Sequence, residues 1–367
     1  MPVPLPRPRA VMLLLALAAA LLLAAALSSA AMASAGGSLY TQTNDPSGNA
    51  VQRFERGRDG SLTPAGTFPT GGAGLAALGG RQGAVELSGD DRALYAVNAG
   101  SDSVSVFRTG RRAPRLVASA PSRGVAPASI AEHRGRVYVL NSGGTPNVAA
   151  FWRRFDGSLA PIPGGTRELA PGALGAAQVS VTPDGRSLVV SERLANRLET
   201  LPLDFLGRPG ASVVTASSGT VPFGFGISPQ GTIVVSEAGL STVSSYRAGA
   251  DGALRTITPS LAVGQGAACW VAVSPSGRFA YTGNASGSIS GFAIARDGSL
   301  KAVSTTALTP SPRDLDFDAG GRYLLAVSPV TAAAGGQVTS YRVGRDGSLT
   351  VVGSAPAAAG VTGAAAL

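Results

Sequence analysis

The sequence predicts an all-β protein: a seven-bladed β-propeller with four strands in each blade, closed into a ring by the C-terminal strand. Three observations support this fold class: a composition rich in glycine and proline and two interleaved series of turns at regular spacing. The 367 residues include 50 Gly and 25 Pro. That content is too high for a helical bundle and suits many short strands joined by turns.

The first series of turns consists of Asp-Gly pairs. They begin at Asp59, Asp156, Asp251, Asp297 and Asp346, with gaps of 97, 95, 46 and 49 residues. Each long gap is about twice a short one, and degenerate turns near Arg111 and Leu206-Gly207 divide the long gaps. A period of about 44–50 residues with four strands in each unit is typical of propeller blades.

The second series of turns lies between the members of the first. It comprises Asp90-Asp91, Arg134-Gly135, Asp184-Gly185, Gln230-Gly231, Ser276-Gly277 and Gly320-Gly321. Each turn separates two short apolar runs, which is the pattern of a β-hairpin. Together the two series define seven units.

The first unit is incomplete. It opens at Leu39-Tyr40-Thr41, where the second strand of a blade belongs. The segment Val361–Leu367 follows the seventh unit and can provide the missing innermost strand. Closing the ring with strands from both termini removes the exposed sheet edge of an open array.

The N-terminal segment has the features of a secretory signal peptide. Arg7 and Arg9 precede an apolar run of 18 residues, Ala10–Leu27, and small residues follow, ending in Ala33-Ser34-Ala35. We therefore expect residues 1–35 to be removed and residues 36–367 to form a single propeller domain. The alternative is a membrane anchor, since 18 apolar residues nearly span a bilayer. With cleavage favoured, we expect a secreted or periplasmic monomer without a membrane partner.

Charge and rare residues exclude several classes of protein. The net charge is +9, but only Arg111-Arg112 and Arg153-Arg154 are adjacent basic pairs, and no basic run interleaves with aromatics. We expect a solubilising surface and no nucleic-acid partner. The single Cys269 excludes an intrachain disulfide or a thiolate cluster, and the single His133 excludes a His-cluster metal site. The repeat places His133 in a turn after an inner strand.

Polar residues end the second strand of every unit. They are Thr43, Asn98, Asn141, Glu192, Glu237, Asn284 and Ser328. An inner strand begins where the antiparallel second strand ends, so the residues opening the inner strands should surround the same channel mouth. These include Arg81, Gln82, Gln178, Phe223, Cys269, Trp270, Arg313 and Asp314. The pattern predicts a ligand funnel at this mouth.

Structural roles are open for several of these residues. The asparagines could instead bond the backbone of the next loop, and Trp270 could belong to the core or form a binding platform. Cys269 is expected to be a small buried packing residue. Glu192 and Glu237 come from neighbouring blades at equal depth. They could form an acid–base pair or bind a hard cation such as Ca²⁺, or each could pair with Arg193 or Arg313. No other cofactor is expected.

Two segments, Val181–Arg186 and Val273–Arg278, resemble the repeat of the seven-bladed β-propeller lactonase family, and so do the Asp-Gly-Ser-Leu turns at Asp156, Asp297 and Asp346. That family includes 6-phosphogluconolactonases and carboxymuconate-cyclase-like enzymes. The resemblance covers essentially the whole mature chain. The segments 222–238 and 267–271 are similar to exported bacterial members.

The resemblance implies lactone hydrolysis but carries over only in part. The family often opens a mid-chain inner strand with Pro-Arg-His and ends the next strand with Glu. Here Glu192 stands at the position of the family's Glu, but Ala177-Gln178 replaces the Arg-His pair. In the seventh unit, Pro312-Arg313-Asp314 keeps the arginine without the histidine. An amide does not titrate. The acid–base role would therefore rest on Glu192 or Glu237, with Arg313 or Arg81 steadying an anionic substrate or oxyanion.

These inferences give one expected function and one alternative. We expect an exported lactonase that opens a small sugar-derived or acidic lactone at the polar channel mouth. The residues expected to contact its substrate are Gln178, Arg81, Asn98, Asn141, Trp270 and Asn284. The alternative is a non-catalytic propeller that binds a small molecule, a glycan or a protein on the same face.

Overall fold

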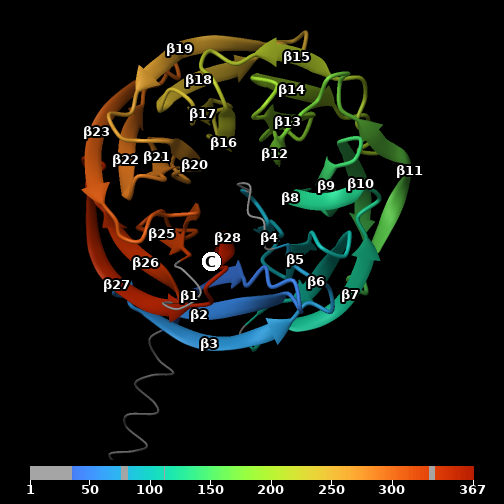
Figure 1. The fold of residues 1–367 in the computed structure, drawn as a ribbon, viewed down its shortest axis with the longest axis horizontal. Coiled ribbons are helices and arrows are strands. Elements are labelled where there is room, and N and C mark those ends of the chain that lie inside the picture. Colours follow the sequence, from blue (N-terminus) through green and yellow to red (C-terminus); the bar gives the residue numbers. More distant parts are fainter. Residues whose placement is uncertain (1–34, 76–81, 111, 330–334) are drawn as a thin grey trace, which may run out of the picture.

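The seven predicted blades form a closed ring of four-stranded antiparallel sheets around a central channel (Figure 1). The computed structural model describes residues 35–75, 82–110, 112–329 and 335–367. The predicted signal peptide falls almost entirely outside these residues, and so does Arg81. Within the described residues, no helix is long and apolar enough to cross a membrane.

Each blade runs from an inner strand A at the channel to an outer strand D. In blade order, the strands A to D are β28(Thr362–Ala366), β1(Ala35–Gln42), β2(Ala50–Gly57), β3(Leu62–Pro69); β4(Val85–Leu87), β5(Ala93–Asn98), β6(Ser103–Arg108), β7(Arg115–Pro121); β8(Val125–His133), β9(Arg136–Gly143), β10(Asn147–Arg153), β11(Leu159–Glu168); β12(Ala176–Val181), β13(Ser187–Glu192), β14(Arg197–Pro202), β15(Val213–Ala216); β16(Pro222–Ile227), β17(Ile233–Glu237), β18(Thr242–Ala248), β19(Leu254–Ala262); β20(Ala268–Val273), β21(Phe279–Asn284), β22(Ser288–Ile294), β23(Leu300–Ala307); β24(Asp314–Phe317), β25(Tyr323–Ser328), β26(Gly336–Val343) and β27(Leu349–Ala357).

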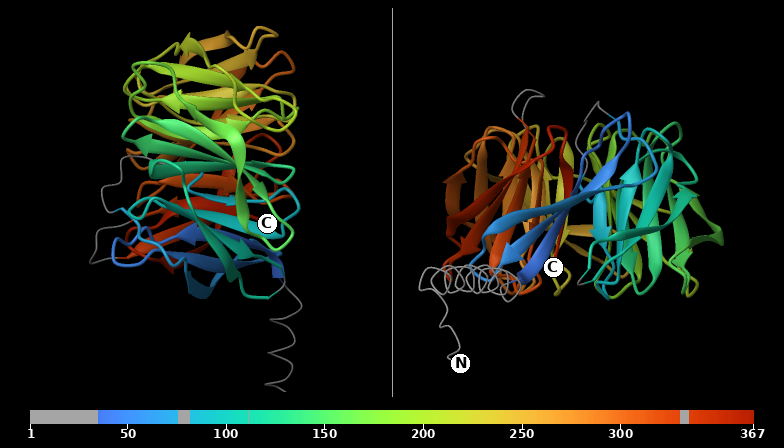
Figure 2. Two further views of the ribbon diagram at one scale, coloured as in Figure 1. Left: turned by 90° about the vertical axis from the view of Figure 1, so that its right-hand side faces the viewer. Right: turned by 90° about the horizontal axis from the view of Figure 1, so that it is seen from below.

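The last strand of the chain closes the ring, as predicted. β28 pairs antiparallel with β1, with Leu39 opposite Ala366 and Tyr40 opposite Ala365. Blade 1 thus takes its inner strand from the C-terminus, and both ends of the described chain meet in one sheet (Figures 1 and 2). A buried ion pair between Arg56 of blade 1 and Asp318 of blade 7, 3.2 Å apart, adds to this junction.

The two series of turns lie on one face of the disc, where strand A leads to B and strand C leads to D. We call this face the turn face and the opposite one the mouth face. His133 ends β8 on the turn face, opposite Arg136, as the repeat predicted. The Asp-Gly turns join strands C and D, and each aspartate accepts a bond from the residue two positions later. Asp297 accepts bonds from the backbone N–H and hydroxyl of Ser299, and Asp251 accepts one from Ala253 N.

The core lies between the blades. Strand B is the most deeply buried strand, and all six residues of β5, β21 and β25 are inaccessible to solvent or nearly so. Apolar side chains from adjacent blades form shared clusters. One cluster joins Val106 of blade 2 to Val139 and Phe151 of blade 3. Because each blade buries its apolar faces against its neighbours, the ring holds the inner strands at fixed positions around the channel.

Candidate functional site in the central channel and at its mouth

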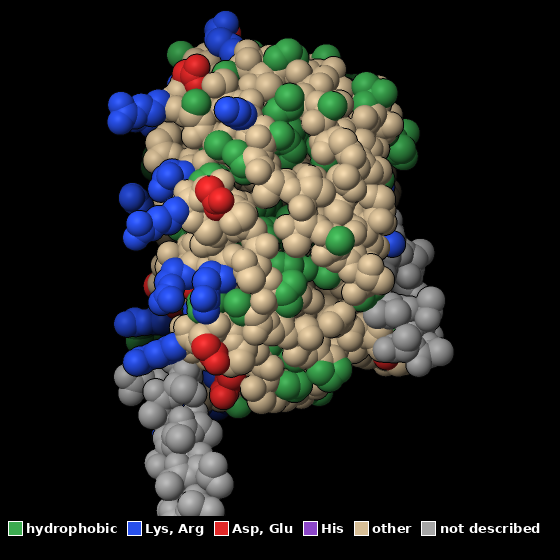
Figure 3. Space-filling view, turned by 90° about the vertical axis from the view of Figure 1, so that its left-hand side faces the viewer, with side chains coloured by type: hydrophobic (Ala, Val, Ile, Leu, Met, Phe, Trp, Pro, Cys, Tyr) green, Lys and Arg blue, Asp and Glu red, His purple; other side chains and the backbone are tan. Residues whose placement is uncertain are grey.

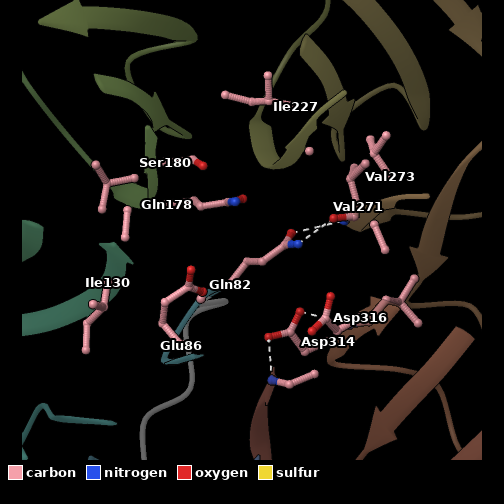
Figure 4. A pocket seen from close by; sticks show the side chains of 17 residues that line it. Gln82, Glu86, Ile130, Gln178, Ser180, Ile227, Val271, Val273, Asp314 and Asp316 are labelled. Carbon is pink, nitrogen blue, oxygen red and sulfur yellow. Dashed lines mark hydrogen bonds between the residues drawn. The ribbon is translucent and has the colours of Figure 1, made fainter. Parts of the chain in front are cut away.

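The centre of the ring contains a polar cavity of about 190 Å³. Inner strands of all seven blades line it. Its titratable and amide side chains are Gln82, Glu86, Gln178, Asp314 and Asp316 (Figure 4). Of the predicted catalytic or substrate-binding residues that the structure describes, Gln178 alone lines this cavity.

Two glutamines bind the free backbone edges of inner strands. The Gln82 amide crosses the channel to blade 6, donating to Val271 O at 2.5 Å and accepting from Val271 N at 3.0 Å (Figure 4). Gln178 bonds Phe225 of the next blade in the same way, at 2.8 and 2.7 Å. An amide carries both a donor and an acceptor, so it satisfies the two unpaired groups of an edge residue. Gln178 therefore has a structural role as well as a place in the cavity wall.

Three carboxyl groups also line the cavity. Asp314 and Asp316 alternate along β24 and accept the backbone N–H groups of Ala364 and Ala366 at 3.1 and 2.9 Å. Glu86 projects from β4 toward the same space (Figure 4). Within residues 35–75, 82–110, 112–329 and 335–367, no basic side chain lines the cavity. Among the described residues, no three acidic, histidine or cysteine side chains are placed to hold a metal ion.

Burial and mutual repulsion favour the protonated form of these carboxyl groups. Burial raises the pKa of Asp316 to about 7, with a smaller contribution from Asp318. The pKa of Asp314 is raised well above its usual value by burial, and the nearby Asp316 raises it further. The pKa of Glu86 is raised in the same way by burial and by Asp316. A carboxyl group with a pKa near neutrality can both accept and donate a proton at physiological pH.

A row of arginine and aromatic side chains lies at the mouth face, where the inner strands begin. The guanidinium of Arg313 lies over the indole of Trp270, 5.5 Å from its ring centre. Trp270 meets Phe223 edge to face at 5.5 Å, and Arg193 lies over Phe223 at 5.2 Å. The four residues come from blades 4 to 7. The predicted neighbours Arg313 and Trp270 are thus together.

The mouth row contains hydrogen-bond donors without protein acceptors. Within the described chain, neither Arg193 nor Arg313 forms an ion pair. The Arg193 Nε and Trp270 Nε1 atoms are buried and have no hydrogen-bond partner among the described residues. Burial lowers the pKa of Arg193, which still remains a cation. Cys269 lies in the same cluster, and burial raises the pKa of its thiol to about 11, in agreement with its predicted packing role. Guanidinium groups without an acidic partner in the described chain suit an anionic ligand.

Glu192 lies inside blade 4 rather than in the channel wall. It has no solvent-exposed surface. Its carboxylate accepts a bond from Arg197 Nε at 2.8 Å and another from Leu174 N at 3.0 Å. Burial raises its pKa to about 7, with Glu199 adding to the rise and Arg197 opposing it. Arg197 also contacts Glu199 at 2.9 Å, so one guanidinium joins two buried carboxylates.

Glu237 is enclosed within blade 5 in a comparable way. It too has no exposed surface, and its carboxylate accepts bonds from Gly219 N, Ser217, Thr242 and Ser244 at 2.6 to 3.0 Å. All these partners belong to blade 5 or to the segment leading into it. No interaction joins Glu192 to Glu237, and each carboxylate is neutralised or hydrogen-bonded within its own blade.

The three predicted asparagines have local partners. Asn98 donates to Ser103 and Ser105, and Asn284 donates to Ser288 and Ser290, in each case on strand C of the same blade. Asn141 donates to Ser122 O and Asn147. All three are fully buried. A side chain at the end of strand B points toward the start of strand C, which explains why these residues fasten the B–C loops and do not line the cavity.

The sequence left several site residues unassigned. Arg193 was considered only as an ion-pair partner of Glu192, and Glu86 and Asp316 were not singled out. A signal was present in the alternation Asp314-Leu315-Asp316, since charged residues are rare on the inner strand of a buried sheet. Phe223 was placed at the mouth but given no role.

Comparison with known proteins agrees with this architecture. The family model described as "Lactonase, 7-bladed beta-propeller" matches residues 158–271 and 241–362, which together make up more than half of the sequence. The chain belongs to the seven-bladed β-propeller lactonase family. Among curated proteins, no relative matches the sequence.

Solved structures share the fold of this lactonase-family propeller at low sequence identity. A proposed 6-phosphogluconolactonase from Bacteroides uniformis is 20% identical with a TM-score of 0.73, and the match covers 88% of this chain and 96% of that one. The periplasmic gluconolactonase PpgL of Pseudomonas aeruginosa is 19% identical with a TM-score of 0.70, over 90% and 99% of the two chains. A Lactobacillus plantarum protein is 18% identical with a TM-score of 0.73, over 90% and 99%.

Proposed function

We propose that this propeller hydrolyses a small lactone that carries a carboxylate or phosphate group, as the family membership favours. The observation that carries the proposal is the mouth row, in which Arg193 and Arg313 have no anionic partner in the described chain and flank the Phe223–Trp270 pair. Guanidinium groups bind carboxylates and phosphates through paired hydrogen bonds. The aromatic pair is buried, with Phe223 6% and Trp270 1% exposed, and packs beneath the two guanidinium groups.

Ring opening requires a group that takes a proton from water and returns it to the leaving oxygen. Two carboxyl groups have a pKa of about 7, Glu192 and Asp316. Glu192 has no exposed surface and is already bonded to Arg197 and Leu174. Asp316 lines the open cavity. We therefore assign the proton transfer to Asp316 and keep Glu192, the sequence-based candidate, as the alternative to be tested beside it.

The proposed reaction balances with water as the only co-reactant. A water molecule attacks the lactone carbonyl carbon and transfers one proton to the Asp316 carboxylate. A guanidinium of the mouth row would hold the acidic group of the substrate while the carbonyl group reacts beside Asp316. The ring C–O bond then breaks, and the leaving oxygen takes the proton back from Asp316. The product is the open-chain hydroxy acid, and Asp316 returns to its starting state.

The test is a comparison of three variants on a panel of aldonolactones with and without an acidic group. Loss of a general acid–base group typically lowers a rate by about 10²–10⁴-fold. We expect Asp316→Asn to lose at least the lower of these factors while remaining folded, because asparagine keeps an acceptor for Ala366 N. His133→Ala, on the turn face, is the control and should keep full activity.

Two outcomes would change the assignment. If Glu192→Gln is folded and inactive while Asp316→Asn retains activity, the proton-transfer role belongs to Glu192. If the unmodified protein does not exceed the uncatalysed rate on any lactone, the alternative function applies. Gln178 cannot titrate and is already bonded to Phe225, a feature that favours a ligand-binding propeller without catalysis.

A further inference from the structure

The basic side chains of this propeller are concentrated on the turn face. Exposed arginines stand in or beside the A–B turns of five blades, around the far end of the channel: Arg92, Arg134, Arg186, Arg278 and Arg322. A second set stands in the C–D turns farther from the axis: Arg58, Arg112, Arg154, Arg296 and Arg345. Figure 3 views the disc from its rim and shows lysine and arginine side chains crowded along one face and sparse along the other.

The mouth face has fewer exposed basic residues, although the partly exposed Arg193 and Arg313 lie there. The exposed basic residues there, within the described chain, are Arg123 and Arg167, and the exposed acids Asp45, Asp102 and Glu168 offset them. On the turn face, many acids are committed to local bonds. Asp156 accepts from Ser158, and Asp90 pairs with Arg153 at 2.8 Å. These acids remain ionised and offset part of the arginine charge. The exposed basic residues of the turn face nevertheless outnumber its exposed acids, so an excess of positive charge remains for an external partner.

Two phenylalanines project from the same face. Phe155, in the C–D turn of blade 3, is completely exposed, and Phe205, in the C–D turn of blade 4, is 82% exposed. Their turns are well fixed: Gly157 N donates to Arg154 O, and Arg208 N donates to the Asp204 carboxylate. Arg136 of blade 3 also donates to Phe205 O at 2.8 Å. Fully exposed aromatic side chains on ordered turns, next to basic residues, are typical of segments that insert into a membrane interface.

The chain also enters the propeller from the turn face. Ala35, the first residue of β1, lies opposite Gly57, next to the C–D turn of blade 1. The apolar run Ala10–Leu27 precedes this point by only a few residues. If this run associates with a membrane, either before cleavage or as a retained anchor, the turn face would be held toward the bilayer.

We propose that the turn face binds the surface of an anionic lipid bilayer, with Phe155 and Phe205 in the interface and the surrounding arginines on lipid phosphates. The inference does not depend on the proposed lactonase activity. It leaves the channel mouth directed away from the membrane and open to solutes. The sequence predicted no membrane partner once the signal peptide is removed. The gathering of the arginines on one face is visible only in the assembled ring.

The test uses residues 35–367, which contain all seven sheets and their closing strand. Sedimentation with phosphatidylcholine vesicles, with and without phosphatidylglycerol, measures partitioning. We expect binding only to the anionic vesicles and a decline with added salt. Arg154→Glu should weaken partitioning about fivefold or more, since one basic residue near an anionic surface contributes about that factor. Phe155→Ser with Phe205→Ser should weaken it about tenfold or more.

The matched control replaces two exposed leucines of the mouth face, Leu194→Ser with Leu240→Ser, which are 59% and 62% exposed. This control should partition as the unmodified protein does, and equal melting temperatures should show that all variants are folded. The proposal is overturned if the anionic lipid makes no difference or if the leucine variant loses as much binding as the phenylalanine variant. It is also overturned if the phenylalanines have no effect and heparin competes fully, since the face then binds polyanions by charge alone.

Discussion

The Asp314 carboxylate on β24 accepts a hydrogen bond of 3.1 Å from the backbone N–H of Ala364 on β28. Two residues along each strand, Asp316 bonds Ala366 in the same way at 2.9 Å. The other edge of β28 pairs with β1. The last strand of the chain is thus held on both edges, by a sheet ladder on one side and by two channel carboxylates on the other.

Removal of the closing strand should destabilise the entire ring. Deletion of Val361–Leu367 would expose the edge of β1 and remove Val361, Ala364 and Ala365 from a buried setting. We expect the melting temperature to fall by about 10 °C or more, or the protein to aggregate. Differential scanning calorimetry measures the change. A melt identical to that of the full chain would show that closure contributes nothing to stability.

The channel carboxyl groups should make the protein more stable in mild acid than at neutral pH. The pKa of Asp316 is about 7 in the folded protein and near 4 in an unfolded chain, so the folded state binds the proton more tightly between these values. Its contribution to the free energy of unfolding therefore falls as the pH rises from about 4 to about 7. Asp314 and Glu86 act in the same direction.

Melting curves at pH 5 and pH 7.5 test this effect. We expect a higher melting temperature at pH 5 and a smaller difference for Asp316→Asn, which cannot titrate. The turn aspartates do not contribute in this window, because their pKa values are lowered and they remain ionised. Higher stability at pH 7.5 than at pH 5 would contradict the assigned pKa shifts.

The C–D turns require glycine for two reasons, illustrated by Gly60. Its φ is +92°, which side-chain-bearing residues rarely adopt, and a methyl group there would overlap the ring of Tyr323 in blade 7. Gly60→Ala should lower the free energy of unfolding by about 2 kcal/mol or more. Gly48→Ala is the matched control, since nothing lies within 4 Å of the added methyl. Equal denaturant midpoints for the two variants would refute the packing role of this turn.

Cys269 should be chemically inert in the folded protein. It is 7% exposed, and burial raises its pKa to about 11, so the reactive thiolate is scarce at neutral pH. We expect no reaction with a disulfide reagent such as Ellman's reagent until denaturant is added, and then one thiol per chain. Rapid labelling of the native protein would place this side chain in an accessible part of the mouth.

The sequence was sufficient for the blade number, the positions of the turns and the ring closure, because hairpins follow from local residue types at a fixed period. It was less informative about the site. The repeat placed Asn98, Glu192 and Glu237 at the same position, the end of strand B, in their blades. The position of the backbone does not determine where a side chain points. At the end of strand B these side chains turn toward strand C, where serine, threonine or arginine partners are available.

The cavity was missed for a related reason. Its carboxylates and amides face backbone groups of other blades, as Gln82 does with Val271, 189 positions away in sequence. Contacts of this kind appear only once the ring is assembled. The Arg313–Trp270 pair was anticipated as a group at one mouth, because both residues open inner strands and need no long-range information.

The most direct test of the proposed function is the effect of Arg313→Met on two matched lactones, one with an acidic group and one without. Methionine keeps an unbranched side chain over Trp270 but removes the charge that would bind the acidic group. We expect kcat/KM for the acidic lactone to fall by about 100-fold or more and that for the neutral lactone to change only a few-fold. An equal loss on both lactones, or none on either, would contradict the assignment of the arginine and aromatic row as the binding site.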